Sequence, residues 1–187
     1  MSGLTDQAIA DHTRHWIEAA VIGLNLCPFA KSVYQKGLVR VVVSQARHLD
    51  GFLDELDREL LLLRDTPASE IETTLLVHPK LFPEFEVFND FLNVVDDVLQ
   101  EHELEGEIQV APFHPKFQFE GTQPSDISNA TNWAPYPTLH LLREASIEQV
   151  IDAGADPDAI VDRNVALLQQ MGPEGWNQIS IKYATKD

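Results

Sequence analysis

Several features are scarce in this chain, and each scarcity excludes a class of protein. There is one cysteine, Cys27, which cannot form an internal disulfide, so nothing indicates an oxidising compartment. Basic residues are few: 13 Lys and Arg stand against 30 Asp and Glu, giving a net charge of −17. A chain this acidic is repelled by phosphate backbones, so we expect no general nucleic-acid binding.

Long apolar runs are also missing. No stretch approaches the roughly 20 apolar residues that a membrane-spanning helix needs. The amino terminus has no basic segment followed by a hydrophobic block, as a signal peptide would. We therefore expect a cytoplasmic protein without a membrane partner. The sequence indicates no particular cofactor and no oligomeric state.

The 187 residues suit one domain, spanning residues 1–187, with a full hydrophobic core. Apolar residues at helical spacing and short β-branched runs predict alternating helices and strands. The predicted helices cover 5–24, 49–64, 84–102 and 156–172, with a short helix capped by Ser146. The predicted strands cover 38–43, 73–77 and 107–111, and 25–37 is predicted as a break.

This alternation predicts an α/β fold: a single domain with a small, partly parallel sheet, βαβ crossovers and packed helices. Both a thioredoxin-like and a ferredoxin-like arrangement are compatible with it. Residues 138–142 suit a fourth strand or a helical turn. The segment from 113 to 137 has neither period, yet it is aromatic and polar, and long irregular loops of this kind are usually functional.

A His-Pro-Lys triplet occurs twice, each time directly after a predicted strand, at His78 and at His114. In open α/β sheets, ligands bind outside the carboxyl ends of the strands. If the two strands are parallel neighbours, both histidines lie at that edge, and Ser44 leaves the first strand there too. The alternative is that two strands simply end in similar polar turns.

A second candidate group is His140 with Arg143 and Glu144. If 138–142 is a strand, His140 shares a face with Thr138 and Leu142. A histidine can serve as acid or base, and an arginine can bind a carboxylate or phosphate in bidentate fashion. The alternative is a structural network in which Arg143 pairs locally and His140 bonds to the backbone.

Metal binding and thiol chemistry are further alternatives. His114, His140 and His78 with Glu120 or Asp126 could form a zinc or iron site, and so could His12, His15 and Glu18. No pair has a diagnostic ligand spacing, so the metal remains unknown. Cys27 lies in Cys-Pro-Phe-Ala without a second cysteine, which excludes dithiol chemistry and favours a buried, inert thiol.

Three segments carry a family resemblance: Leu-Asn-Leu-Cys-Pro-Phe-Ala at 24–30, Phe-His-Pro-Lys-Phe-Gln-Phe at 113–119, and Ala-Pro-Tyr-Pro-Thr-Leu-His-Leu-Leu-Arg-Glu at 134–144. Together they resemble an uncharacterised bacterial family, domain of unknown function 1415. The resemblance covers essentially the whole chain. It implies a bacterial protein and implies no activity.

These observations lead to two hypotheses. In the first, the protein binds a small molecule, with catalysis left open, in a pocket at the strand ends. His114, His140 and Arg143 would act on the ligand, and His78, Asn132, Tyr136 and Glu144 would help to bind it. In the second, the aromatic loop at 113–137 binds a protein partner or packs on the core, without catalysis.

Overall fold

A four-stranded sheet in the order β1-β2-β4-β3 forms the centre of the fold. The structure is a computed structural model that describes residues 4–181. Its strands are β1 (Val39–Val43), β2 (Thr73–Val77), β3 (Ile108–Phe113) and β4 (Thr138–Arg143). The chain is thus one mixed α/β domain with a small sheet, as the alternation of helical and strand patterns predicts.

β4 runs in the opposite direction to the other three strands of the sheet. β1 and β2 are parallel neighbours, whereas β4 is antiparallel to both β2 and β3. β1, β2 and β3 therefore point the same way, and β4 lies between β2 and β3. The condition that β2 and β3 are parallel neighbours is met only in direction, because the connection at 114–137 brings the chain back as the antiparallel strand β4 between them.

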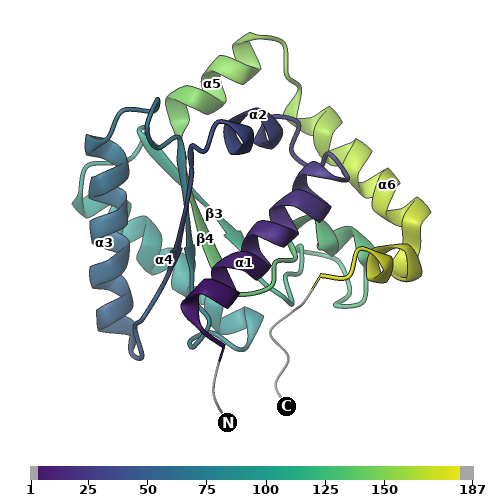
Figure 1. Cartoon of the computed structure of the whole chain (residues 1–187), viewed down its shortest axis with the longest axis horizontal. Coiled ribbons are helices and arrows are strands. Elements are labelled where there is room, and N and C mark those ends of the chain that lie inside the picture. The colour runs from purple at the N-terminus through teal and green to yellow at the C-terminus, as the bar shows by residue number, and fades with distance from the viewer. Residues whose placement is uncertain (1–3, 182–187) are drawn as a thin grey trace.

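Helices cover both faces of the sheet (Figure 1). α3 (Leu49–Asp65) and α4 (Phe85–Glu101) pack on one face, around buried side chains that include Leu76, Leu139 and Leu141. α1 (Asp6–Trp16) and α6 (Pro157–Gln178) pack on the other, with Leu75 and Val77. Alternate residues of β2 thus contribute to two separate cores, as the twofold period of a strand requires.

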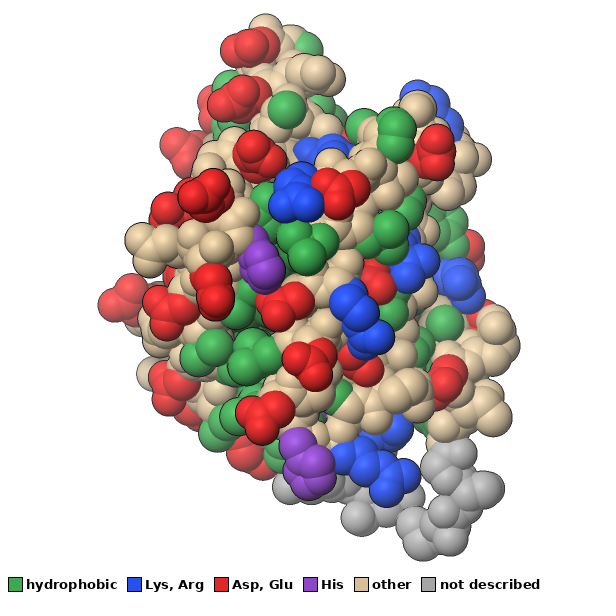
Figure 2. All heavy atoms as spheres, turned by 90° about the vertical axis from the view of Figure 1, so that its left-hand side faces the viewer, with side chains coloured by type: hydrophobic (Ala, Val, Ile, Leu, Met, Phe, Trp, Pro, Cys, Tyr) green, Lys and Arg blue, Asp and Glu red, His purple; other side chains and the backbone are tan. Residues whose placement is uncertain are grey.

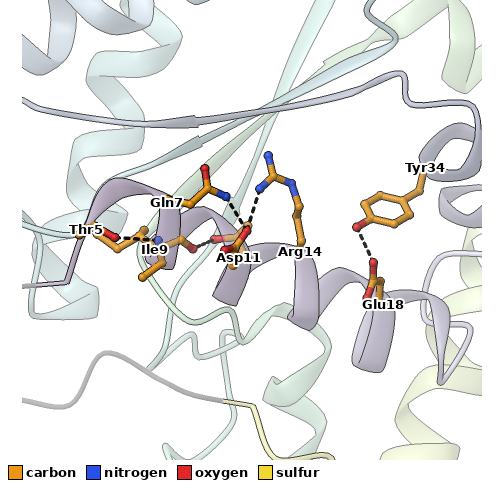
Figure 3. Close-up of polar contacts among 9 residues, drawn as sticks. Thr5, Gln7, Ile9, Asp11, Arg14, Glu18 and Tyr34 are labelled. Carbon is orange, nitrogen blue, oxygen red and sulfur yellow. Dashed lines mark hydrogen bonds and ion pairs between the residues drawn. The ribbon is translucent and has the colours of Figure 1, made fainter.

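Helix ends follow local sequence signals. Thr5 caps α1 by accepting a hydrogen bond from the amide of Ala8. Asp156 caps α6 by accepting from Asp158 and Ala159, with Pro157 in the first turn. Polar contacts also run along α1, where Gln7 and Arg14 both donate to Asp11 (Figure 3).

Three predicted boundaries differ from the structure. The predicted break contains a short helix, α2 (Ala30–Gln35), which is joined to the preceding segment by a 2.7 Å hydrogen bond from Tyr34 Oη to Glu18 (Figure 3). α5 (Glu144–Asp152) begins directly after β4, so Ser146 does not cap it. Helical structure resumes after Gly172-Pro173, although Gly172 itself has φ 66° and ψ 177° and breaks the hydrogen-bond ladder.

Two further segments are helices of other types, which the spacing of apolar residues in the sequence does not predict. α1 continues as a π-helix, η1 (Ile17–Ile22), and a Cβ at the following Gly23 would collide with the carbonyl oxygen of Ala19. Within the long loop, η2 (Ile127–Asn132) is a 3-10 helix capped by Asp126. Both have hydrogen-bond spacings other than the α-helical one.

The 30 acidic residues exceed the 13 basic ones. On the face that includes α3, acidic side chains are scattered, with basic ones among them (Figure 2). Within residues 4–181, no helix combines the length and the apolar character that crossing a bilayer requires.

Candidate functional site

His78 and His114 flank the start of β4 at one edge of the sheet. Thr138, the first residue of β4, pairs with Val77 on one side and Phe113 on the other. Each histidine follows its strand directly, and the amide of His78 donates to Pro137 at 2.8 Å. Because strands lie about 4.8 Å apart, one intervening strand separates β2 from β3 by roughly 10 Å. The shared edge expected from the repeated triplet is therefore present, with β4 in between.

The repeated triplet forms the same turn twice. In the first copy, His78 Nδ1 accepts from the amides of Lys80, at 3.3 Å, and Leu81, at 2.8 Å. In the second copy, His114 Nδ1 accepts from the amide of Lys116 at 2.9 Å. A ring nitrogen that accepts carries no proton, so both neutral imidazoles have their hydrogen on Nε2. The backbone of the turn thereby fixes the tautomer.

Burial keeps both rings uncharged at neutral pH. His78 is 0% exposed and His114 is 1% exposed. Burial lowers the pKa of His78 to about 4, and it also lowers the pKa of His114. Desolvation disfavours the charged imidazolium. Each ring is therefore a neutral hydrogen-bond donor through Nε2.

The two histidines differ in what their Nε2 atoms contact. His114 Nε2 donates to the carbonyl oxygen of Phe82 at 2.9 Å. His78 Nε2 is buried and has no hydrogen-bond partner among the described residues. Phe82 adopts φ 58°, a left-handed conformation unfavourable for an aromatic residue. Its carbonyl thus reaches His114 from a strained turn, while His78 is left with an unused donor.

A carboxylate on α3, that of Glu55, acts electrostatically on the unpaired histidine. Phe52 packs edge to face on the His78 ring, with centroids 4.5 Å apart, and Glu55 follows three residues later on the same helix. The Glu55 charge acts on His78 and opposes the lowering of its pKa by burial. Glu55 Oε1 accepts from the amide of Gln45 at 3.0 Å, whereas its Oε2 is buried without a partner.

His78, Glu55 and Gln45 lie where the parallel strands β1 and β2 end, a place called here the His78 corner. Gln45 lies just beyond β1, and the Ser44 amide donates to Val77, the last residue of β2, at 2.8 Å. The ammonium group of Lys80 reaches the Gln45 side-chain oxygen at 3.4 Å on the exposed side. Glu55 and His78 thus lie at the carboxyl ends of β1 and β2, where α/β sheets usually bind ligands.

His140 is distant from this corner and has a structural partner. It lies in the middle of β4, opposite Leu75 and Ala111. Its Nε2 is 2.7 Å from Thr73 Oγ1, which donates to the carbonyl oxygen of Leu141 at 2.6 Å. Since the hydroxyl has one hydrogen, the imidazole is the donor to Thr73. Burial lowers the pKa of His140 to about 4, so this ring is also neutral.

Arg143 and Glu144 lie at the opposite end of the sheet. Arg143 ends β4, five residues from Thr138, which corresponds to roughly 17 Å along the strand. Its guanidinium donates to the carbonyl oxygens of Leu63, Thr66 and Ile71. Glu144 begins α5. The structure therefore does not bring His114, His140 and Arg143 together, and Arg143 connects β4 to the end of α3.

Asn132 and Tyr136 hold the long loop against the sheet. The side-chain amide of Asn132 donates to the carbonyl oxygen of Pro112 at 3.1 Å. The main-chain carbonyl oxygen of Asn132 accepts from the main-chain amide of His114 at 3.1 Å. The hydroxyl of Tyr136 lies 2.8 Å from His12 Nδ1, and burial raises the pKa of Tyr136. These contacts give both residues a positioning role at the end of β3 and the start of β4.

Most aromatic side chains of the long loop pack against the rest of the domain, and Phe119 is the exposed exception among those described. The indole nitrogen of Trp133 donates to the carbonyl oxygen of Phe117 at 2.9 Å, and its ring meets that of Trp176. Phe117 is buried, whereas Phe119 is 37% exposed. Asn129 is fully buried. Its side-chain oxygen accepts from the amide of Phe119 and the hydroxyl of Thr122, and its side-chain nitrogen donates to the carbonyl oxygen of Gln123. The loop is thus an ordered part of the domain.

No metal site is assembled among the described residues. Within 4–181, no group of three or more His, Cys, Asp or Glu side chains is placed to hold an ion. At His78 and His114 the turn places the hydrogen on Nε2, which leaves neither ring with a free lone pair for a metal. Cys27 is a free, partly buried thiol.

A groove lies elsewhere, where the turn before α2 faces α5 and α6. Its volume is about 690 Å³, and its lining includes Pro28, Phe29, Ile160 and Arg163. Arg163 and Asn164 bind backbone carbonyls of the same turn, at Asn25 and Leu26. None of the sequence-predicted site residues lines this groove.

Sequence reasoning missed Glu55 and Phe82. Glu55 lies next to Leu56 in the apolar stripe of α3, and an acidic residue beside a buried stripe is a detectable signal. Phe82 has no such signal, because its left-handed backbone follows from the turn that connects β2 to α4. The burial of both depends on how α3 packs on the sheet.

The comparison with protein families identifies one match over nearly the whole domain. The family model described as protein of unknown function (DUF1415) matches residues 8–178. No curated protein and no solved structure matches the chain. The match confirms the resemblance seen in the segments at 24–30, 113–119 and 134–144. The chain belongs to the family DUF1415.

Proposed function

We propose that this protein is a small-molecule-binding domain whose site lies at the carboxyl ends of β1 and β2, around His78 and Glu55. The observation that carries the proposal is that His78 Nε2 and Glu55 Oε2 are two of the three buried side-chain atoms without a hydrogen-bond partner among the described residues, the third being Thr74 Oγ1 within β2. A buried polar atom without a partner costs roughly 1–3 kcal/mol, and native proteins contain few of them. A ligand that bonds to such an atom removes this cost.

The placement of the two groups supports the same proposal. They lie at the carboxyl ends of adjacent parallel strands, the edge where open α/β sheets usually bind ligands. The ring of His78 is held by two amides and by Phe52, so its donor points in a fixed direction. Fixed polar groups at the edge of an apolar core are typical of ligand sites.

The proposed site does not include the three residues that the sequence predicted as catalytic. His114, His140 and Arg143 each have side-chain hydrogen bonds within the domain. We assign them to positioning the strand ends and α3. We assign the central place to His78, predicted as a ligand-binding residue, with Glu55 as the second polar group of the proposed site.

The test is a thermal-shift screen of small polar compounds, charged and neutral, on the native protein and on His78→Asn. Asparagine keeps an acceptor for the Lys80 amide and removes Nε2. We expect compounds that carry an acceptor beside a donor to raise the melting temperature of the native protein and not that of His78→Asn. His114→Asn, altered in the matching turn, should retain the response if it folds.

The result that overturns the proposal is equally specific. If no compound stabilises the native protein, or if the stabilisation survives in His78→Asn, the site is not at His78. Nitrogen NMR of labelled histidine gives a second readout that does not depend on stability. A true ligand shifts the Nε2 resonance of His78 and leaves that of His140 unchanged.

We further infer a cytoplasmic location and a bacterial source, supported by the single cysteine and by the family resemblance. The strongly acidic composition supports the absence of a nucleic-acid partner. Fractionation of cells that express the tagged protein tests the location directly.

A further inference from the structure

The groove beside α6 has the size and the lining of a small-ligand site. Its volume is about 690 Å³. Small-molecule sites are usually clefts of roughly 300–1,000 Å³ with apolar walls and a few polar groups. Three segments line this one: the turn before α2, the end of α5 and the start of α6, which gather at one end of the molecule (Figure 1). Its lining is apolar except for two charged side chains, Asp156 and Arg163.

One face of α6 forms the long wall of the groove. Asp156, Ala159, Ile160 and Arg163 line it, at the spacing i, i+3, i+4, i+7 that places residues on one face of a helix. Asp156 caps the helix. Arg163 follows about two turns later, which corresponds to roughly 10 Å along the helix axis. The groove therefore has a carboxylate near one end, a guanidinium near the other and apolar side chains between them.

The guanidinium of Arg163 is held in place and has unused donors. Its Nη2 donates to the carbonyl oxygen of Asn25 and to Oδ1 of Asn164, which is itself buried. Its Nε and Nη1 have no hydrogen-bond partner among the described residues, and no Asp or Glu in 4–181 forms an ion pair with it. A planar, fixed guanidinium with free N–H groups matches the geometry of a carboxylate.

The opposite end of the groove suits a cation. Asp156 Oδ1 accepts from the amides of Asp158 and Ala159, at 3.1 and 3.2 Å. The amide of Ile160 donates to the Asp156 carbonyl oxygen, and Pro157 has no N–H. The first turn of α6 thus has no free amide for a ligand anion. The negative charge of Asp156 remains, and it attracts a positive group.

We propose that this groove binds a short apolar peptide with free ends, its carboxylate at Arg163 and its ammonium group at Asp156. An extended chain spans at most roughly 3.3–3.6 Å per residue, so a tripeptide matches the distance between the two charges. Its apolar side chains would pack on Phe29 and Ile160. The inference goes beyond the function proposed at the His78 corner and shares no residue with it.

The net charge of the protein is compatible with this ligand. At −17 the chain repels anions at long range. A free-ended apolar peptide carries one charge of each sign and is neutral as a whole, so it avoids that repulsion. It still pairs locally with both charged side chains of the groove. Charge complementarity therefore favours the free-ended peptide over a simple carboxylate.

The experiment is an NMR titration of nitrogen-labelled protein with the tripeptide Ala-Leu-Ala. We expect the amide resonances of Gly154, Ala155 and Ala159 to shift, and those of the His78 corner to stay in place. The same peptide is then used with an acetylated amino end or an amidated carboxyl end. Each block removes one ion pair and should weaken binding by about threefold or more, a modest factor because the pairs are exposed.

Matched variants assign each end of the peptide. Arg163→Gln removes the charge and keeps an amide donor for the Asn25 carbonyl oxygen. This variant should bind the free and the amidated peptide equally. Asp156→Asn keeps a good helix cap and should bind the free and the acetylated peptide equally. Arg58→Gln removes an exposed cation from α3, which does not line the groove, and should leave binding unchanged. Circular dichroism verifies that each variant is folded.

Three outcomes overturn the inference. The first is equal binding of the free and both blocked peptides, or no shift at the groove at the highest soluble peptide concentration. The second is a set of groove shifts that depends on protein concentration, with a dimer in light scattering, because a second copy then occupies the groove. The third is loss of peptide binding in folded His78→Asn, which would place the peptide at the His78 corner and support the function proposed there.

Discussion

His78 and His114 occupy the same turn at two strand ends, but only His114 has a partner for its Nε2, the carbonyl oxygen of Phe82 at 2.9 Å. Phe82 itself belongs to the turn that follows His78, and its ring lies 5.8 Å from the His78 ring. The turn after His78 therefore supplies the acceptor for His114 Nε2, whereas His78 Nε2 has no acceptor among the described residues. This asymmetry distinguishes a structural histidine from a candidate ligand group.

The asymmetry predicts unequal costs for the same substitution. His114→Asn removes the donor to a buried carbonyl oxygen, whereas His78→Asn removes a donor that has no partner. Both lose a similar ring from a packed site. We expect His114→Asn to lower the free energy of unfolding by about 1–3 kcal/mol more than His78→Asn does. Urea unfolding of the two variants measures the difference, and equal losses would contradict it.

Acid should destabilise the protein before its carboxylates titrate. The folded pKa values of His78 and His140 are about 4, below the ordinary value of 6.5. Between these values the unfolded chain binds protons that the folded chain does not, so stability falls as pH decreases. Above pH 6.5 both states are neutral at these positions and the contribution is constant.

The expected slope is about 1.4 kcal/mol per pH unit for each buried histidine. Urea unfolding at pH 5, 6 and 7.5 measures it. A His140→Leu variant removes one titrating group and should show a shallower slope, whatever its absolute stability. A free energy of unfolding that stays constant from pH 7.5 to pH 5 would show that these histidines are protonated in the folded state.

Arg143 should matter for stability and not for ligand binding. Arg143→Met keeps much of the apolar stem and removes the donors to the carbonyls of Leu63, Thr66 and Ile71. We expect a loss of about 3 kcal/mol, since hydrogen bonds from a charged donor contribute more than neutral ones. Arg64→Met, which breaks an exposed pair with Asp65, should change little. Loss of compound binding in a folded Arg143→Met would restore its role as an anion clamp.

Two glycines should respond to alanine in opposite directions. Gly172 has φ 66° and ψ 177°, a conformation nearly restricted to glycine, so Gly172→Ala should cost about 1–3 kcal/mol. Gly51 lies within α3, and an added Cβ would meet only Ala46 at 3.5 Å, an ordinary contact. Gly51→Ala should therefore stabilise the protein by up to about 1 kcal/mol. Thermal unfolding compares both with the native chain, and a stabilised Gly172→Ala would be inconsistent with the break in α6.

Local sequence patterns were sufficient to predict the helices that bury one face against the sheet, and the strand β1. The apolar stripes of α3 and α4, the β-branched run of β1 and the cap at Asp156 predict those elements to within a few residues. They were insufficient for α2 and for the two irregular helices, η1 and η2. Those segments are short, and their hydrogen-bond spacing does not leave a 3.6-residue period in the sequence.

The sequence by itself determined the α/β class, the two strand-end histidines and their matching turns, because periodicity and a proline after each histidine act over a few residues. The tertiary structure decided strand order, and with it the separation of His140 and Arg143 from the His78 corner. It also decided which histidine keeps a free donor and which carboxylate acts on that histidine electrostatically. Those outcomes depend on contacts between residues distant in the chain, such as His114 with Phe82 and Glu55 with Gln45, and local pattern carries no information about them.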